Sequence, residues 1–127
     1  MHSSFQFKRA IHLFNKVLEL SPYNTEALLG RGLCLEALLE PQKALEDFDK
    51  ALAIKPFNHL VLFNRGLFWL KKMEWQKAFI DLEHAIDIEA GIIDYYYNFL
   101  LAAYPLKKWQ NILHITTDLL EDNPRDL

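Results

Sequence analysis

The chain has 127 residues, of which 51% are hydrophobic and 24% charged, a composition that suits a folded domain and argues against disorder. Its net charge is −3 and no run of Lys or Arg exceeds two residues, so the charge pattern of a nucleic-acid or anionic-membrane binder is missing. No stretch approaches the roughly 18 apolar residues of a membrane helix, and the N-terminus lacks the apolar core of a signal peptide.

The sequence repeats itself every 34 residues. The stretch RGLCLEALL at Arg31 returns as RGLFWLKKM at Arg65, and a weaker third copy follows. Apolar residues within a copy recur at spacings of three and four, as at Phe48 and Leu52, which is typical of amphipathic helices. The sequence therefore predicts an all-α helical-repeat solenoid of about seven antiparallel helices, with residues 1–127 forming a single domain.

Residues 5–22 match only the second half of a repeat. Counting back 34 residues from Ala44 and Phe48 gives Ala10 and Phe14, whereas nothing corresponds to a preceding first helix. Either the chain is a piece of a longer array or the repeat is naturally truncated. In both cases the apolar residues of this helix are expected to lack their usual cover, and these are Phe5, Phe7, Ile11 and Phe14.

Two complete repeats follow, over residues 25–58 and 59–92, and each is predicted to consist of two antiparallel helices of about thirteen residues. Asn24 and Asn58 stand where the repeats begin and are candidate N-caps. Pro41 marks the break between the paired helices, since proline is tolerated in a first helical turn.

A third repeat, over residues 93–126, departs from the pattern. Leu100 stands where the other copies have glycine and Ile112 where they have alanine, so its two helices are expected to pack farther apart. The three tyrosines of the run DYYYN point in three directions on a helix, so at most two rings are core and the rest indicate an interface. Pro105 is expected to end the first helix early.

Small residues and one charged pair recur at the same phase of both complete repeats. Gly32 and Gly66 are expected to let the paired helices approach closely. The charged pairs are Arg31 with Asp47 and Arg65 with Asp81. Because both charges are missing from the third repeat, we predict a structural ion pair between paired helices rather than a catalytic dyad.

This pattern resembles the tetratricopeptide repeat family. The resemblance is strong over residues 25–92 and rests mainly on the register beyond them. It is carried by Leu28, Gly32, Leu35, Ala44, Phe48, Ala51 and Pro56, and again by Leu62, Gly66, Trp69, Ala78, Leu82 and Ala85. The resemblance implies a right-handed superhelix whose first helices line a concave surface, on which partner peptides lie.

Mapped onto this chain, that concave surface is mostly apolar and aromatic with an acidic fringe. We therefore expect it to hold a partner peptide or an amphipathic helix, with Phe63, Tyr97 and Tyr104 as anchors. The alternative is that another part of the protein covers the same residues. The predicted partner-binding residues are Leu29, Leu33, Leu60, Phe63, Asn64, Leu67, Lys71, Tyr97, Asn98, Leu101 and Tyr104.

Family members that grip the acidic C-terminal tails of heat-shock chaperones use a clamp of lysine, asparagine and arginine. The matching positions in this chain are Leu29, Leu33, Asn64, Asp94 and Asn98. Only Asn64 fits the clamp, so a carboxylate would meet almost no positive charge there. Chaperone-tail binding is therefore not expected.

No catalytic motif accompanies the repeats. The sequence has no phosphate-binding glycine loop, no HExxH and no GxSxG, and its five histidines lack metal-ligand spacing. Cys34, the only cysteine, lies between two leucines, which favours a small apolar role over a nucleophile. We expect a non-enzymatic cytoplasmic scaffold that needs no cofactor or metal and binds a protein or peptide, but no nucleic acid and no membrane. The alternative is a self-association module that forms a homodimer through its uncapped terminal helices.

Overall fold

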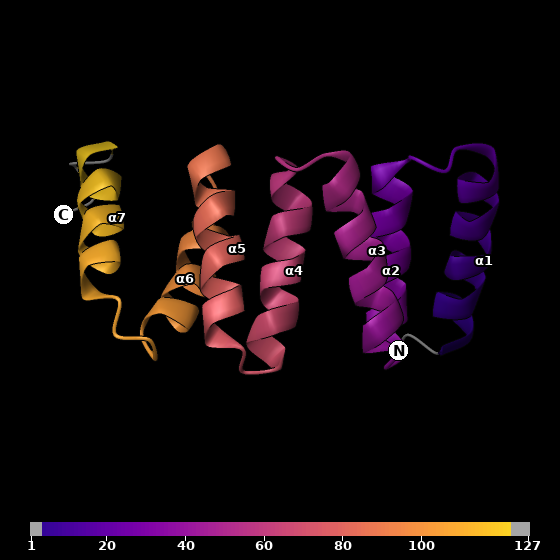
Figure 1. Ribbon diagram of the computed structural model, residues 1–127, viewed down its shortest axis with the longest axis horizontal. Coiled ribbons are helices and arrows are strands. Elements are labelled where there is room, and N and C mark those ends of the chain that lie inside the picture. Colours follow the sequence, from indigo (N-terminus) through magenta and orange to yellow (C-terminus); the bar gives the residue numbers. More distant parts are fainter. Residues whose placement is uncertain (1–3, 123–127) are drawn as a thin grey trace. The chain divides into compact units, whose positions relative to one another are not determined.

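The computed structural model describes residues 4–122, with side chains as far as Asp118. Within that range the protein consists of seven α-helices and has no β-strand (Figure 1), which confirms the predicted all-α helical-repeat fold. The last residues of the predicted third repeat, from 123 onward, lie outside the described part. The helices are α1 (Ser4–Leu20), α2 (Thr25–Ala37), α3 (Pro41–Ile54), α4 (His59–Lys71), α5 (Trp75–Ile88), α6 (Ile93–Ala103) and α7 (Trp109–Asp122).

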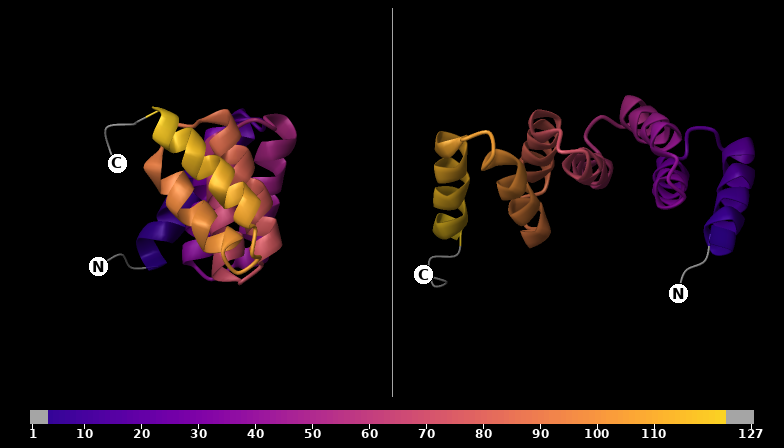
Figure 2. Two further views of the ribbon diagram at one scale, coloured as in Figure 1. Left: turned by 90° about the vertical axis from the view of Figure 1, so that its left-hand side faces the viewer. Right: turned by 90° about the horizontal axis from the view of Figure 1, so that it is seen from below.

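The chain divides into two compact units, one ending at Val61 and the other beginning at Leu62. The first unit contains α1, α2 and α3, and the second contains most of α4 together with α5, α6 and α7. Inside each unit, consecutive helices run in alternating directions and are joined by short loops (Figure 1 and Figure 2).

The predicted N-caps are confirmed. The side-chain oxygen of Asn24 accepts a hydrogen bond from the backbone N–H of Ala27 at 2.9 Å, which satisfies a free donor in the first turn of α2. Asn58 accepts in the same way from the N–H groups of Leu60 and Val61 at the start of α4. Pro41 is the first residue of α3, as predicted.

A residue with left-handed backbone closes the turn between paired helices in all three described pairs. Leu39, Met73 and Lys107 have φ angles of 61°, 57° and 56°, and they stand 34 residues apart. The N–H of the residue after each of them donates to a carbonyl five residues back, as from Glu40 to Leu35 at 2.9 Å. None of the three is glycine, so the sequence did not predict this conformation.

The pair α2 and α3 supplies the core of the first unit. Leu28, Ala44 and Phe48 are fully buried between the two helices. A Cβ added to Gly32 would lie 2.6 Å from a ring carbon of Phe48, far inside van der Waals contact. The predicted role of this glycine in close helix packing is confirmed.

Helix α1 packs against α2 but leaves much of its apolar surface open. The ring of Phe14 lies directly over Gly30 and is half-buried, so the expectation that Phe14 lacks cover is wrong. Phe5, Leu13 and Leu20 remain exposed, and no residue of α1 is fully buried.

The second unit has its core between α4, α5 and α6. Phe79 and Phe99 pack with ring centroids 5.3 Å apart, and a Cβ on Gly66 would lie 2.8 Å from Cγ of the buried Leu82. Helix α7 is attached more loosely, because no side chain from residue 109 to 118 is buried and its contact with α6 is sparse. This agrees with the wider packing expected for the third pair.

Candidate functional site

The repeated arginine and aspartate form bidentate ion pairs. Arg31 donates from Nε and Nη2 to the two carboxylate oxygens of Asp47 at 2.8 and 2.7 Å, and Arg65 donates to Asp81 at 2.7 and 2.8 Å. The aspartates are 5% and 3% exposed. The hydrogen bond that the Arg31 guanidinium donates to Asp47 raises the pKa of Arg31, so the arginine stays charged.

These pairs are structural, as predicted. Each joins the two helices of one repeat, and each carboxylate already accepts two hydrogen bonds from its arginine. Arg31 also donates from Nη1 to the side-chain oxygen of Asn15 at 2.9 Å, which links α1 to the same ion pair. A carboxylate held in this way is not available as a general base.

Three of the predicted partner-binding residues lie in the first unit. Leu29 is half-buried on α2, whereas Leu33 on α2 and Leu60 on α4 are exposed. Leu33 neighbours Cys34, which is half-buried, and burial raises the pKa of the Cys34 thiol. A thiol with a raised pKa is protonated at neutral pH and is a poor nucleophile.

The other eight predicted residues lie in the second unit, on α4, on α6 and at the C-cap of α6. The side chains of Tyr97 and Leu101 on α6 are 63% and 45% exposed. Tyr104, the C-cap residue of α6, keeps helical backbone angles and is 67% exposed, so the spacing of four and three residues places all three side chains on one face. Tyr104 also meets Trp109 edge to face, with centroids 5.1 Å apart. Asn98 donates from its amide to the backbone oxygen of Asp94 at 2.8 Å.

On α4 the predicted residues are less open. The ring of Phe63 stacks on buried Tyr95 with centroids 4.5 Å apart, so this aromatic ring joins α4 to α6. Asn64 and Leu67 are half-buried, and Lys71 is exposed at the end of the helix. The structure thus brings Phe63 against α6 and leaves α6 with the larger exposed apolar surface.

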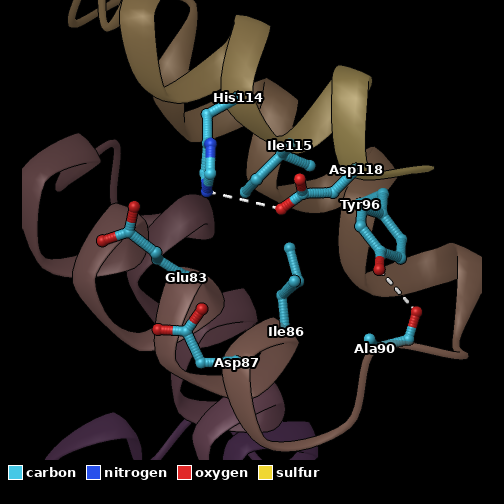
Figure 3. Close-up of a pocket in the computed structure, with 8 residues that line it drawn as sticks. All are labelled: Glu83, Ile86, Asp87, Ala90, Tyr96, His114, Ile115 and Asp118. Atoms are coloured by element: carbon cyan, nitrogen blue, oxygen red, sulfur yellow. Dashed lines mark hydrogen bonds and ion pairs between the residues drawn. The ribbon is translucent and has the colours of Figure 1, made fainter. Parts of the chain in front are cut away.

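A hollow of about 330 Å³, which the sequence reasoning missed, lies between α5 and α7 in the second unit (Figure 3). His114 and Asp118 form a salt bridge of 3.3 Å on its α7 side, and Tyr96 donates from its hydroxyl to the backbone oxygen of Ala90. The complete lining is Glu83, Ile86, Asp87, Ala90, Tyr96, His114, Ile115 and Asp118.

The one sequence signal for this hollow is Ile115. It stands in the register position that Asp47 and Asp81 occupy in the other repeats, and the arginine position holds Phe99. Because no ion pair draws α7 onto α6, a space beside Ile115 is left open. We define the residues lining this space, given above, as the acidic hollow.

Within the described residues, no three His, Cys, Asp or Glu side chains are grouped as a metal ion requires. The helices of residues 4–122 also include none with the length and apolarity needed to cross a membrane.

Comparisons with known proteins agree with this architecture. Residues 25–58 match the family model of the tetratricopeptide repeat. No curated protein sequence matches the chain.

Solved structures resemble most of the chain at low identity. A crystal structure of MamA superposes with a TM-score of 0.76 at 24% identity, covering 93% of this chain and 69% of that one. PilF of Pseudomonas aeruginosa gives 0.79 at 24% identity, over 94% of this chain and 55% of PilF. The first TPR of Spaghetti (RPAP3), bound to the HSP90 peptide SRMEEVD, gives 0.74 at 19% identity, over 80% and 81% of the two chains. Residues 25–58 thus match a tetratricopeptide repeat, and the chain has the fold of these helical-repeat structures.

Proposed function

We propose that the protein is a protein–protein interaction scaffold that binds an apolar strip or an amphipathic helix of a partner. The observation that carries this proposal is the exposed row of Tyr97, Leu101 and Tyr104 along one face of α6. Large apolar side chains at this spacing match the repeat of an amphipathic helix lying against them. The residues of α4 that contribute to the same surface are Phe63, Asn64, Leu67 and Lys71, and Asn98 completes it on α6.

The first unit adds a smaller apolar set made of Leu29, Leu33 and Leu60. Two structures with this fold contain a bound partner: the first TPR of Spaghetti (RPAP3) is bound to an HSP90 peptide, and Naa15/Naa10 is bound to HypK-THB. Binding of a protein or peptide is therefore the general function that the fold supports. We assign it to the row of Tyr97, Leu101 and Tyr104, which we call the α6 row.

The chemistry of this surface favours an apolar partner over an acidic peptide. Asp94 lies one turn before Asn98 on α6, and the Asn98 side-chain amide donates to the Asp94 backbone oxygen. A peptide carboxylate arriving there would meet the like charge of Asp94 and an amide that already uses one of its two N–H groups. No catalytic step and no cofactor form part of this proposal. A half-buried, unreactive Cys34 thiol suits a reducing compartment, so we assign the scaffold to the cytoplasm.

The test is a pair of matched variants. Helical peptides would be selected from a displayed library on the wild-type protein, and their affinity measured by fluorescence anisotropy. We expect Tyr97→Asp with Leu101→Asp to weaken binding at least about 30-fold, because an anchoring aromatic residue contributes about 2 kcal/mol. Tyr23→Asp changes another exposed tyrosine, outside the proposed surface, and should leave the affinity unchanged.

The acidic peptide SRMEEVD serves as the ligand control, and we expect it not to bind the wild-type protein. Circular dichroism must show that both variants keep their helices. Equal affinities for the α6 variant and the Tyr23 variant would place binding elsewhere, and tight binding of the acidic peptide would contradict the proposed chemistry.

A further inference from the structure

Helix α1 presents a cleft that is lined by apolar and basic side chains of this one helix. Phe5 and Leu13 are 63% and 64% exposed, and they line this cleft together with Lys8, Arg9 and His12. The Arg9 guanidinium lies over the Phe5 ring, 5.7 Å from its centroid. The side chains of Lys8 and His12 make no hydrogen bond or ion pair with any other described residue. We call these five residues the α1 cleft.

The acidic hollow carries the opposite charge. Its three carboxylates belong to Glu83, Asp87 and Asp118, and Figure 3 shows those of Glu83 and Asp118 on facing sides of the space. Glu83 accepts only a neutral amide hydrogen bond, from Asn111 at 3.0 Å. Asp118 pairs with His114, and Asp87 has no partner among the residues described. The negative charge of the acidic hollow is therefore largely uncompensated.

The hollow also has apolar walls. Ile86 of α5 and Ile115 of α7 both line it, so a side chain that enters would find a nonpolar surface beside the three carboxylates. Lysine and arginine combine an apolar stem with a charged end, which is the side-chain type that such a hollow accommodates.

We propose that the two surfaces bind each other between copies of this chain. The α1 cleft of one copy docks on the acidic hollow of a second, so that Lys8 and Arg9 reach the carboxylates of Asp87 and Asp118. Phe5 and Leu13 cover the apolar walls in the same step. A second copy is favoured over an unrelated basic protein because one chain carries both complementary surfaces.

This contact differs from a symmetric pairing of terminal helices. The two surfaces are different, so each copy keeps one free surface for another copy, and the association continues as a chain or closes as a ring. The α6 row proposed above for a peptide partner takes no part in it. Either proposal can therefore fail without the other.

Charge reversal tests the proposal on the intact protein. One variant carries Lys8→Glu and Arg9→Glu, and the other carries Asp87→Lys and Asp118→Lys. Sedimentation equilibrium over a range of protein concentrations should show wild-type association that weakens with added salt. Each variant alone should associate at least about tenfold more weakly, because like charges then face each other.

The mixture of the two variants is the decisive sample. In it, each reversed surface finds a partner of opposite charge on the other variant, so association should return, and it should also return in a single chain carrying all four changes. A control with Lys50→Glu and Lys55→Glu reverses two other exposed lysines and should behave like the wild type.

Three results would overturn the proposal, provided that circular dichroism shows folded variants. They are a wild type that stays monomeric up to millimolar concentration, a mixture that stays monomeric although the wild type associates, and a variant of either surface that associates as well as the wild type. One form of the third result is a loss of association in the α1 variant while the hollow variant still associates. It would show that α1 binds another surface.

Discussion

At the scale of single residues, each complete repeat is fastened by one bidentate ion pair. The arginine side chains are about a quarter exposed, whereas their aspartate partners are almost fully buried. A carboxylate in that position is stable only while its arginine is present, because an unpaired buried charge is costly. The pair therefore controls how the two helices of a repeat are oriented.

Removing one partner of the ion pair should lower the free energy of unfolding far more than removing an exposed aspartate. We expect Asp81→Ala to lower the free energy of unfolding by about 3 kcal/mol, since it leaves Arg65 partly buried without its carboxylate. Asp87→Ala, on the exposed side of the same helix, should change it by less than about 0.5 kcal/mol. Urea unfolding at low protein concentration measures the free energy of unfolding of both variants. Similar decreases in the two would show that the ion pair adds no stability.

At the scale of elements, the turns between paired helices owe their shape to hydrogen bonds rather than to residue type. Leu39, Met73 and Lys107 share no side-chain chemistry, yet all three adopt the left-handed conformation at the same register. For residues other than glycine this conformation costs about 1 kcal/mol. The capping bonds to the preceding helix offset that cost.

Glycine should therefore be a better residue at such a turn. We expect Met73→Gly to raise the free energy of unfolding by up to about 1 kcal/mol and the melting temperature by a few degrees, because Met73 is exposed and its side chain buries little surface. Met73→Ala is the matched control, since it removes the side chain but keeps the Cβ atom that causes the strain. Thermal unfolding followed by circular dichroism compares the two. A gain of the same size in both would rule out strain as the cause.

At the scale of the whole molecule, the sequence predicted the features that depend on neighbours within one repeat. The helices, the caps at Asn24 and Asn58, the packing role of Gly32 and the ion pairs all follow from residues at fixed spacing. The acidic hollow did not follow, because it depends on how far α7 lies from α5. The stacking of Phe63 on Tyr95 was missed for the same kind of reason, since it joins first helices of different repeats. Whether the predicted partner-binding residues bind a partner stays a prediction.

Helix α7 lacks the ion pair of the other repeats and buries no side chain from residue 109 to 118. Such a helix can detach while the rest of its unit stays folded, because few contacts must break. We expect hydrogen exchange, followed by mass spectrometry, to show α7 amides losing protection at a free energy well below that of α5. Equal protection of the two helices would show one cooperative unit instead. If α7 detaches as expected, it acts as a hinged flap, and the volume of the acidic hollow varies as the flap opens and closes.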